Sequence, residues 1–512
     1  MRFSKLIALA LTVVGLIIWG SNVACGSPVL VKLELANELD YQKANQLNVA
    51  VYHKFPTETG QPHLVIAEFE KSNLAALDNA GLPYQVVDED PWSESYYLIS
   101  ESQRTESVSL SEYGEILVST GKSYFMKISD ESARSLAAKG YYIVKVFRRP
   151  LPLKYKPTTE SSPKGHSYYP EIDSLLSLIS QDSLYAWTLR LQNFQTRYSY
   201  SDSIIRARNW IFNQFLSFDI DSLWLHYYYD DSPQWNVVAT VVGTARPDKV
   251  IVVGGHYDSV VYGAGTNPYI WAPGADDNGT GTVATLEMAR IIARNPLPVT
   301  VMFVPFAQEE QGLIGSWYFA HWLYYHYADV HLMINSDMIA HSVDSYQDVI
   351  IYGASSAMDF ISTMMDMANT YTYLHPSYGG QSSGSDHYSF YQWGYDAVFA
   401  AEGDFFYNGW HENYDVVDSL DFSYMKEVVK MCLATLYTEA RSIGYIVGDP
   451  TWNGSIDAGD VVFLLSYLFR SGPAPDPLET GDVTCDGQVN AEDVVFLIDY
   501  LFRGGNPPPS SC

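Results

Sequence analysis

Residues 250–259 read V-I-V-V-G-G-H-Y-D-S. The first four are apolar and β-branched, a run that is typical of a buried strand. A histidine and an aspartate follow almost at once, so polar side chains stand where that strand ends. In open α/β sheets, sites form at the carboxyl ends of the strands. The stretch therefore predicts an α/β fold with a polar site at this edge of the sheet.

Four further segments repeat this arrangement along the chain. They are P-G-A-D-D-N-G-T-G at 273–281, Q-E-E-Q-G at 308–312, N-S-D-M at 335–338 and W-H-E-N-Y-D at 410–415. The third and fourth segments of the five follow the apolar runs Val299–Phe306 and Leu332–Ile334, and the last lies downstream of Asp396–Ala400. Two His, two or three Asp and two Glu from these five segments are candidate ligands. This is a ligand set for two divalent metal ions held close together.

Helical patterns alternate with these strands. Apolar residues recur at helical spacing over Ile172–Leu178, Ile204–Phe218, Thr282–Arg294 and Met425–Ser442. Strands that alternate with helices indicate a three-layer α/β/α sandwich around a mixed, mostly parallel central sheet. We expect this catalytic domain to span residues 170–445.

The order and spacing of the five segments resemble the co-catalytic dizinc aminopeptidases, the superfamily that includes bacterial leucyl aminopeptidase, glutamate carboxypeptidase II and glutaminyl cyclase. The resemblance extends from about Asp182 to about Ile443 and implies two zinc ions as cofactors. The implied ligands are His256 and Asp337 for one ion, Glu310 and His411 for the other, and Asp276 as the bridge.

The resemblance also implies roles for three residues beside the ligands. Glu309 is the expected general base, and Asp258 is expected to orient the imidazole of His256. A cis peptide bond is expected between Asp276 and Asp277. The implied activity is that of an aminopeptidase acting on peptide substrates. The alternatives are a carboxypeptidase or dipeptidase of the same superfamily, or a catalytically inert binding or adhesion protein.

Acidic and aromatic residues near the last segment suggest contacts with substrate. Asp396, Glu402 and Asp404 are candidates for binding a free α-amine. The candidates for an apolar side-chain pocket are Phe405, Phe406, Tyr407, Trp410 and Tyr414. With 40 Tyr in the chain, ordinary packing accounts for such aromatic residues better than a substrate pocket does. Asp386-His387 matches a recurrent segment of the superfamily, without an assigned role.

Residues 28–150 precede the catalytic region, and a Pro-, Lys- and Ser-rich linker over 151–169 separates the two. Leu64–Val87 and Tyr124–Val146 each read as strand, helix, glycine turn and strand. This internal similarity predicts a small α+β domain built from a repeated element. It is either a removable pro-domain or a passive accessory domain.

The C-terminal region, 448–512, contains two copies of a loop-helix repeat at an offset of 33 residues (482 − 449). Each loop places oxygen ligands as an EF-hand does, with glycine at position 6 and Asp in place of the usual Glu at position 12. The repeats resemble those of type I dockerins, which implies an all-α, EF-hand-like module that binds calcium and a cohesin-like protein partner. The candidate ligands are Asp449, Thr451, Asn453, Ser455, Asp457 and Asp460 in the first loop, and Asp482, Thr484, Asp486, Gln488, Asn490 and Asp493 in the second.

Charge argues against nucleic acid as a partner. Thirty Lys and Arg against 59 Asp and Glu give a net charge of −29, whereas phosphate binding needs a basic patch. Cys432, Cys485 and Cys512 remain after the first 26 residues, an odd number that defines no disulfide framework. A bridge between Cys485 and Cys512 is one open alternative.

The first 26 residues read as a signal peptide. Two basic residues precede an apolar run from Leu6 to Trp19, and small residues follow at 24–27. The run of about 14 residues is too short to span a bilayer, and no later segment is long and apolar enough. We therefore expect a secreted bacterial protein, extracellular or associated with the cell surface. Lipid anchoring through Cys25 is the alternative, but Asn22 stands where such a signal has an aliphatic residue.

Overall fold

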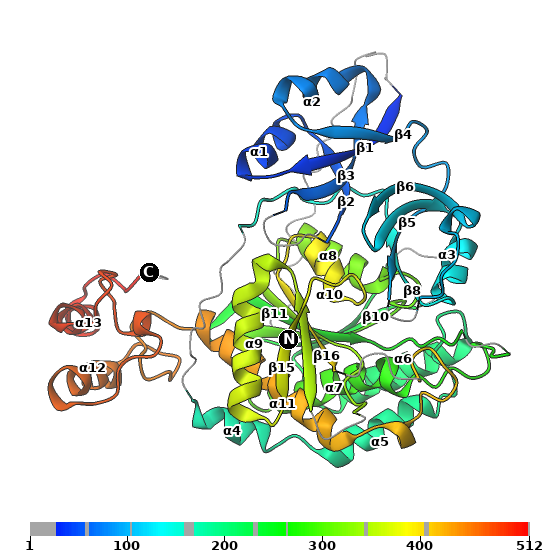
Figure 1. Ribbon diagram of the computed structural model, residues 1–512. Coiled ribbons are helices and arrows are strands. Elements are labelled where there is room, and N and C mark those ends of the chain that lie inside the picture. The colour runs from blue at the N-terminus through cyan, green and yellow to red at the C-terminus, as the bar shows by residue number, and fades with distance from the viewer. Residues whose placement is uncertain are drawn as a thin grey trace, which may run out of the picture.

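The catalytic region is built on one eight-stranded mixed sheet with the order β15-β14-β16-β13-β11-β12-β10-β9. Its four central strands, β16, β13, β11 and β12, are parallel to one another. The computed structural model describes residues 27–56, 61–102, 105–157, 168–228, 234–262, 265–342, 347–403 and 409–509. Figure 1 shows the sheet enclosed by helices. The strands are β9 (Ser222–His226), β10 (Asn236–Val241), β11 (Arg246–His256), β12 (Val299–Phe306), β13 (Asp329–Ser336), β14 (Asp348–Gly353), β15 (His375–Gly380) and β16 (Ala397–Glu402).

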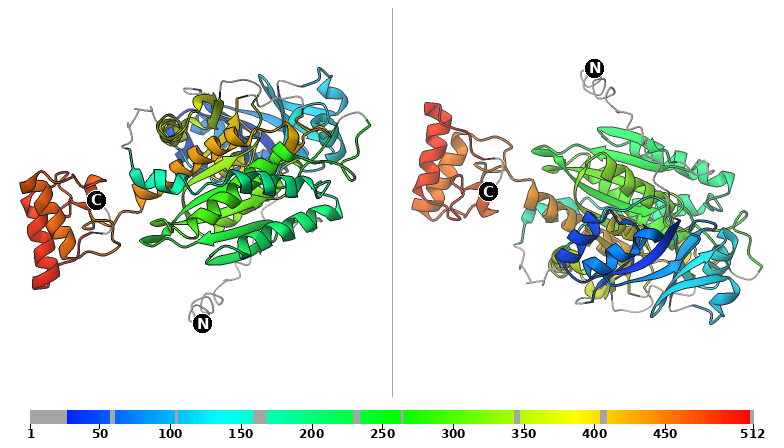
Figure 2. Two further views of the ribbon diagram at one scale, coloured as in Figure 1. Left: turned by 90° about the horizontal axis from the view of Figure 1, so that it is seen from below. Right: turned by 90° about the horizontal axis from the view of Figure 1, so that it is seen from above.

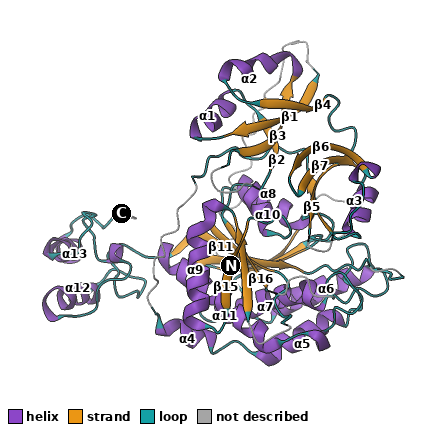
Figure 3. Cartoon of the chain, viewed as in Figure 1, coloured by secondary structure: helices purple, strands orange, loops and turns teal. Residues whose placement is uncertain are grey.

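Helices cover both faces of this sheet because successive residues of a strand point to opposite faces. In β11, Ile251 and Val253 pack into one apolar core, and Val250 and Val252 pack into another. The first core lies under the helices α4 (Pro170–Leu176), α5 (Gln181–Gln192), α6 (Asp202–Leu216), α7 (Gly281–Ile292), α9 (Met358–Tyr371) and α11 (Phe422–Ile443). The second lies under α8 (Ile314–Tyr325) and α10 (His387–Gln392). The predicted three-layer α/β/α fold is confirmed (Figure 3).

The N-terminal region contains two four-stranded antiparallel sheets of the same topology. The first, ordered β2-β3-β1-β4, comprises β1 (Pro28–Leu35), α1 (Glu38–Gln46), β2 (Ala50–Lys54), β3 (His63–Glu70), α2 (Leu74–Ala80) and β4 (Tyr84–Asp88). The second, ordered β6-β7-β5-β8, comprises β5 (Tyr96–Glu101), β6 (Gly114–Thr120), β7 (Ser123–Ile128), α3 (Asp130–Ala137) and β8 (Tyr141–Val146). The two segments that look alike in the sequence, Leu64–Val87 and Tyr124–Val146, are therefore parts of a larger repeated unit. In the first copy this unit has the order β-α-β-β-α-β.

Both N-terminal sheets pack on the catalytic region through apolar side chains. Val29 and Val31 of β1 belong to the same buried core as Phe319 of α8 and Phe390 of α10. A second core joins residues of both N-terminal sheets to Leu313 and Tyr388 of the catalytic region. Figure 1 shows the two sheets together over the side of the catalytic region that carries α8 and α10. Continuous buried cores of this kind hold the two regions in one arrangement.

The C-terminal region forms a separate helical pair, α12 (Ala458–Arg470) and α13 (Ala491–Arg503). Val461 and Leu464 of α12 pack against Val494 and Leu497 of α13. The two pairs of residues differ by the repeat offset of 33 residues, so each copy contributes the same helix face. Both views in Figure 2 show this module standing apart from the sheet-containing body. The predicted all-α module is confirmed.

Among the residues that the structure describes, none of the helices combines the length and the apolar character that crossing a membrane requires.

Candidate metal centre

The site lies at the carboxyl edge of the central parallel strands. His256 is the last residue of β11, Glu309 and Glu310 follow β12, and Asp337 follows β13. The four are brought together because parallel neighbours end at the same edge of a sheet. His411 comes from the loop after β16 and reaches the same point, with Trp410 stacked on its ring at a centroid distance of 4.2 Å.

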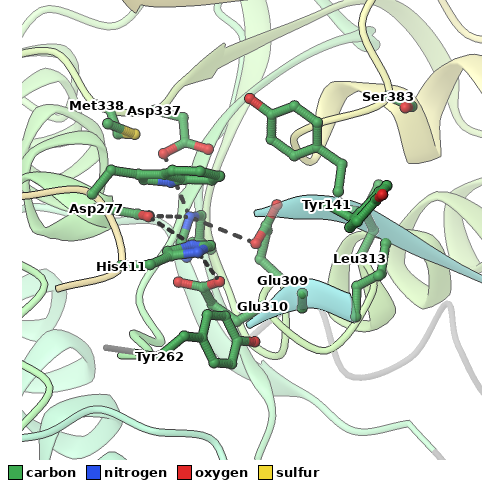
Figure 4. A pocket seen from close by; sticks show the side chains of 16 residues that line it. Tyr141, Tyr262, Asp277, Glu309, Glu310, Leu313, Asp337, Met338, Ser383 and His411 are labelled. Atoms are coloured by element: carbon green, nitrogen blue, oxygen red, sulfur yellow. Dashed lines mark ion pairs between the residues drawn. The ribbon is translucent and has the colours of Figure 1, made fainter. Parts of the chain in front are cut away.

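Acidic side chains converge on the two histidines (Figure 4). His256 Nε2 lies 3.5 Å from Asp337 Oδ1 and 3.3 Å from Asp277 Oδ1. His411 Nε2 lies 3.0 Å from Glu310 Oε2 and 3.2 Å from Asp277 Oδ2. Among the described residues, two clusters of one histidine and two carboxylates share Asp277, and each carboxylate oxygen of Asp277 faces one of the two histidines. A third such group joins His256 to Glu309 and Glu310.

The expectation that Asp276 bridges the ions is wrong, because its carboxylate points away from both histidines. Asp276 Oδ1 accepts hydrogen bonds from the Ala340 amide at 3.1 Å and from Thr280 Oγ1 at 3.0 Å. Burial raises the pKa of Asp276 to about 8. Burial also acts on Asp277, but hydrogen bonds from His256 and His411 lower the pKa of Asp277 below its ordinary value. Of these two aspartates, Asp277 is the one placed between the histidines.

The backbone explains which of the two neighbouring aspartates faces the site. Asp277 has a φ of −98° and a ψ of 99°, an extended conformation, and adjacent side chains point in opposite directions along extended backbone. Asp415 holds this turn, accepting the Asp276 amide at 2.9 Å and the Asp277 amide at 3.0 Å. The cis peptide bond stands between Asp277 and Asn278, one residue later than expected.

Glu309 lies at the edge of the cluster, with Oε2 3.9 Å from His256 Nε2. Burial raises the pKa of Glu309 well above its usual range, and the nearby charge of Glu310 adds to the rise. A carboxyl group with a raised pKa beside a ligand cluster has the property that a general base needs.

Asp258, the residue expected to orient His256, lies against both His256 and the ligand loop, which is the Q-E-E-Q-G segment at 308–312. Its backbone carbonyl is 3.2 Å from His256 Nδ1, and its carboxylate is 3.5 Å from the same atom. The carboxylate also accepts the amides of Glu309 at 3.1 Å and Glu310 at 3.3 Å. Asp258 therefore positions the general-base candidate and one ligand candidate as well as the histidine.

Three residues that support the site are not among those predicted from the sequence. Arg197 is fully buried and donates to the carbonyls of Tyr257, Pro273 and Gly274 at 2.8, 2.6 and 2.6 Å. Ser385 donates to Asp337 Oδ2 at 2.7 Å. Asp415 stands in the quoted W-H-E-N-Y-D segment, so its acidic character beside His411 was the one available signal.

Other predicted substrate contacts fall elsewhere. Asp396 forms an ion pair with Lys156 at 2.9 Å and takes no part in the cluster. Glu402 is buried beside Asp276, away from the pocket. Asp386 and His387 are both buried at the start of α10, with Asp386 immediately before its first residue. Tyr414 is half exposed. Asp404, Phe405, Phe406 and Tyr407 lie outside the described residues.

The donor set fits zinc. Imidazole nitrogens and carboxylate oxygens are ligands that zinc accepts, and the ligand atoms of each cluster lie within 4.8 Å of one another. Glu310 Oε1 and Asp337 Oδ1 are buried without a hydrogen-bond partner among the described residues. Buried carboxylate oxygens normally have partners, so these two oxygens are positioned for a cation.

The two C-terminal loops have the shape of EF-hand loops. Asp449 accepts the amides of Asn453 at 3.1 Å and Gly454 at 2.8 Å, and Gly454 has a φ of +82°. Thr451 Oγ1 donates to Asp460 Oδ1 at 2.7 Å, which brings the first and last acidic positions together. Asp482, Thr484, Gly487 and Asp493 repeat these contacts. Cys485 is disulfide-bonded, and Cys512 lies outside the described residues.

Comparison with known proteins assigns both regions to families. Residues 236–436 match the model of peptidase family M28, and residues 447–502 match that of the dockerin type I domain. Leucine aminopeptidase 1 of Ajellomyces capsulatus (strain NAm1 / WU24) is 29% identical over 308 residues, which cover 56% of this chain and 78% of that protein. Leucine aminopeptidase 1 of Coccidioides posadasii (strain C735) is 26% identical over 340 residues, 61% of this chain and 81% of that protein.

Solved structures share the fold. LapB from Legionella pneumophila superposes with a TM-score of 0.55 at 19% identity, covering 68% of this chain and 99% of that one. LapA aminopeptidase from Legionella pneumophila gives a TM-score of 0.55 at 18% identity, with the same coverage.

Residues 236–436 are therefore described as a peptidase M28 domain and residues 447–502 as a dockerin type I domain. The predicted enzyme class, a metallo-aminopeptidase, is confirmed.

Proposed function

We propose that this protein removes N-terminal residues from peptides at a centre of two zinc ions. The observation that carries the proposal is the position of Asp277, one carboxylate oxygen of which faces His256 and the other His411. Residues His256 and Asp337 would hold one ion, Glu310 and His411 the other, and Asp277 both. The likeness to leucine aminopeptidases over most of their length supports this activity.

When bound, the ions would supply a nucleophilic water at neutral pH and polarise the scissile carbonyl. Glu309 accepts the proton of the attacking water and passes it to the leaving amine. The raised pKa of Glu309 suits both steps, because the group must release a proton as readily as it takes one. The Asp258 carboxylate accepts a hydrogen bond from the Glu309 amide. This contact keeps the base in position during the proton transfer.

An assay of the zinc-loaded protein on matched substrates tests the proposal. Leucyl-p-nitroanilide and its N-acetyl form differ only in the free α-amine. We expect hydrolysis of the first and none of the second. Equal turnover of both would contradict an aminopeptidase, and release of the C-terminal residue from an N-blocked peptide would instead identify a carboxypeptidase.

We further propose that the dockerin domain binds calcium in both loops and attaches the enzyme to a cohesin-like protein outside the cell. The loop contacts of Asp449 and Asp460, repeated in Asp482 and Asp493, support calcium as the ion. The signal-like sequence of residues 1–26 supports export, and those residues lie outside the described part of the chain. Pull-down of the full chain by a cohesin module, with and without calcium, tests the attachment.

A further inference from the structure

The second N-terminal sheet reaches the ligand loop through its edge strand β8. The Lys145 amide donates to the Gly312 carbonyl at 3.2 Å, and Gly312 ends the Q-E-E-Q-G segment that carries Glu309 and Glu310. A Cβ atom on Gly312 would lie 2.8 Å from the Lys145 nitrogen, so glycine permits this approach. Nearby, Ser100 of β5 and Ser383 of the catalytic region form a hydrogen bond of 3.2 Å. Figure 4 shows the cyan strand segments, with Tyr141, beside Glu309 and Leu313.

Tyr142 of β8 enters the pocket beside the ligand cluster. Its ring lies flush on Gly384, where an added Cβ would be 2.9 Å from Tyr142 Cε1 and 3.0 Å from Cζ. The centroid of the ring is 5.9 Å from that of Trp410. It also packs on the buried cluster that contains Met338 and Phe399. Met338 follows Asp337 and Trp410 precedes His411, so the ring sits between residues adjoining two ligand candidates.

Little space remains once Tyr142 is in place. The cavity next to the ligands measures about 40 Å³ and is lined by His256, Asp277, Glu309, Glu310, Asp337 and His411 together with Tyr142. Such a cavity has room for a few water molecules but not for an amino-acid residue. With Tyr142 in this position, the described residues leave no room for a peptide beside these ligands.

We propose that Tyr142 occupies the pocket for the N-terminal side chain of the substrate, so that β8 inhibits the peptidase site, and that the emptied pocket selects aromatic or large aliphatic residues. This inference rests on the proposed aminopeptidase function. The apolar wall of Met338, Phe399 and Trp410 suits such side chains. Burial, together with Tyr352 and Asp337, raises the pKa of Tyr142 well above its ordinary value, so the ring enters as a neutral group.

The N-terminal sheets share buried cores with the catalytic region, so the experiment uses the full zinc-loaded chain and changes only the side chain in the pocket. Tyr142→Ala empties the pocket, and Tyr142→Phe keeps the ring. Tyr142→Thr is a second small variant that retains the β-branched preference for a strand. Tyr124→Ala is the matched control, because Tyr124 lies in the same sheet on β7, outside the cavity lining.

Two quantities are measured: kcat/KM on phenylalanyl-, leucyl- and alanyl-p-nitroanilide, and the Kd of phenylalanine hydroxamate by calorimetry. If Tyr142 is out of the pocket in about a tenth of the molecules or fewer, removing its ring raises kcat/KM and the hydroxamate affinity about tenfold or more. We expect this gain in Tyr142→Ala and Tyr142→Thr, larger for phenylalanyl and leucyl than for alanyl substrate. Tyr142→Phe and Tyr124→Ala should match the wild type.

Unchanged or lower kcat/KM and unchanged hydroxamate affinity in both small variants, with wild-type melting temperature in either, would overturn the inference while leaving the aminopeptidase function intact. A gain in hydroxamate affinity without hydrolysis of any free-amine substrate would support the occupied pocket and refute the proposed function. Equal gains in the Tyr124→Ala control would also overturn the inference, since loosening of the sheet would then account for them.

Discussion

At the scale of single residues, the site depends on which of two adjacent aspartates faces the histidines. Asp277 makes contacts of 3.2 and 3.3 Å with them, and Asp276 makes none. The Asp276 carboxylate instead accepts hydrogen bonds from the Thr280 hydroxyl and from the Ala340 amide. The two residues have identical chemistry, so their different roles come from direction alone.

Asp277→Asn should therefore lose zinc, and Asp276→Asn should retain it. The first change removes the negative charge shared by both ligand clusters, and the second changes a carboxylate that contacts neither histidine and whose Oδ1 accepts from Thr280 and Ala340. Elemental analysis after dialysis, on variants with wild-type melting profiles, measures zinc per chain. Equal zinc contents in the two variants would contradict the assignment of Asp277.

Glu309→Gln should lower kcat by about 10²–10⁴, the usual effect of removing a general base, while the zinc content stays at the wild-type value. The amide keeps the size and hydrogen-bonding capacity of the carboxyl group but cannot take up a proton. Gln311→Asn, a change in the same loop, serves as the control. Turnover within a few-fold of the wild type would remove Glu309 from this role.

At the scale of elements, β2 is joined to α10 by reciprocal hydrogen bonds between Lys54 and Gln392. Lys54 Nζ donates to the Gln392 carbonyl at 2.8 Å, and the Lys54 amide donates to Gln392 Oε1 at 2.9 Å. Burial and the nearby charges of Lys156 and Lys154 lower the pKa of Lys54 to about 7. A buried amino group with a lowered pKa thus lies in the contact between the N-terminal and catalytic regions.

This burial predicts a pH-dependent stability. Between about pH 7 and the ordinary pKa near 10.5, the unfolded chain binds more protons at Lys54 than the folded chain, so the contribution of Lys54 to stability rises with pH. Lys54→Met should raise the melting temperature most at pH 7 and progressively less towards pH 9. Scanning fluorimetry of this variant against the exposed control Lys122→Met measures the effect, and a difference independent of pH would refute it.

At the scale of the whole molecule, the peptidase body and the dockerin module are joined by a few contacts. Arg441 at the end of α11 donates to the Asp476 carbonyl at 3.0 Å and lies over the ring of Trp452 at 4.2 Å. The module has its own small core between α12 and α13. None of the residues in this small core belongs to the apolar cores of the catalytic region.

Calcium removal should therefore loosen residues 447–509 without abolishing hydrolysis. Hydrogen exchange of the module and kcat on leucyl-p-nitroanilide are followed while calcium-depleted protein is titrated with calcium at constant zinc. We expect protection of α12 and α13 to rise with calcium and kcat to change less than about twofold, because the coupling between remote sites is small when few contacts join them. The double variant Asp460→Ala, Asp493→Ala is the control and should not respond.

The sequence alone predicted the α/β sandwich, the helical repeat module and the enzyme class. It also named His256, Glu310, Asp337 and His411, which lie together in the structure, but it gave the place between the histidines to Asp276 instead of Asp277. Apolar periodicity and strand-end motifs are local, so a run such as Val299–Phe306 predicts β12 to the residue. Tertiary structure alone decided which aspartate faces the histidines, because a one-residue difference reverses side-chain direction in extended backbone. It also decided that Tyr142, more than 100 residues before the nearest ligand, lies beside them, since packing between sheets leaves no periodic signal in the chain.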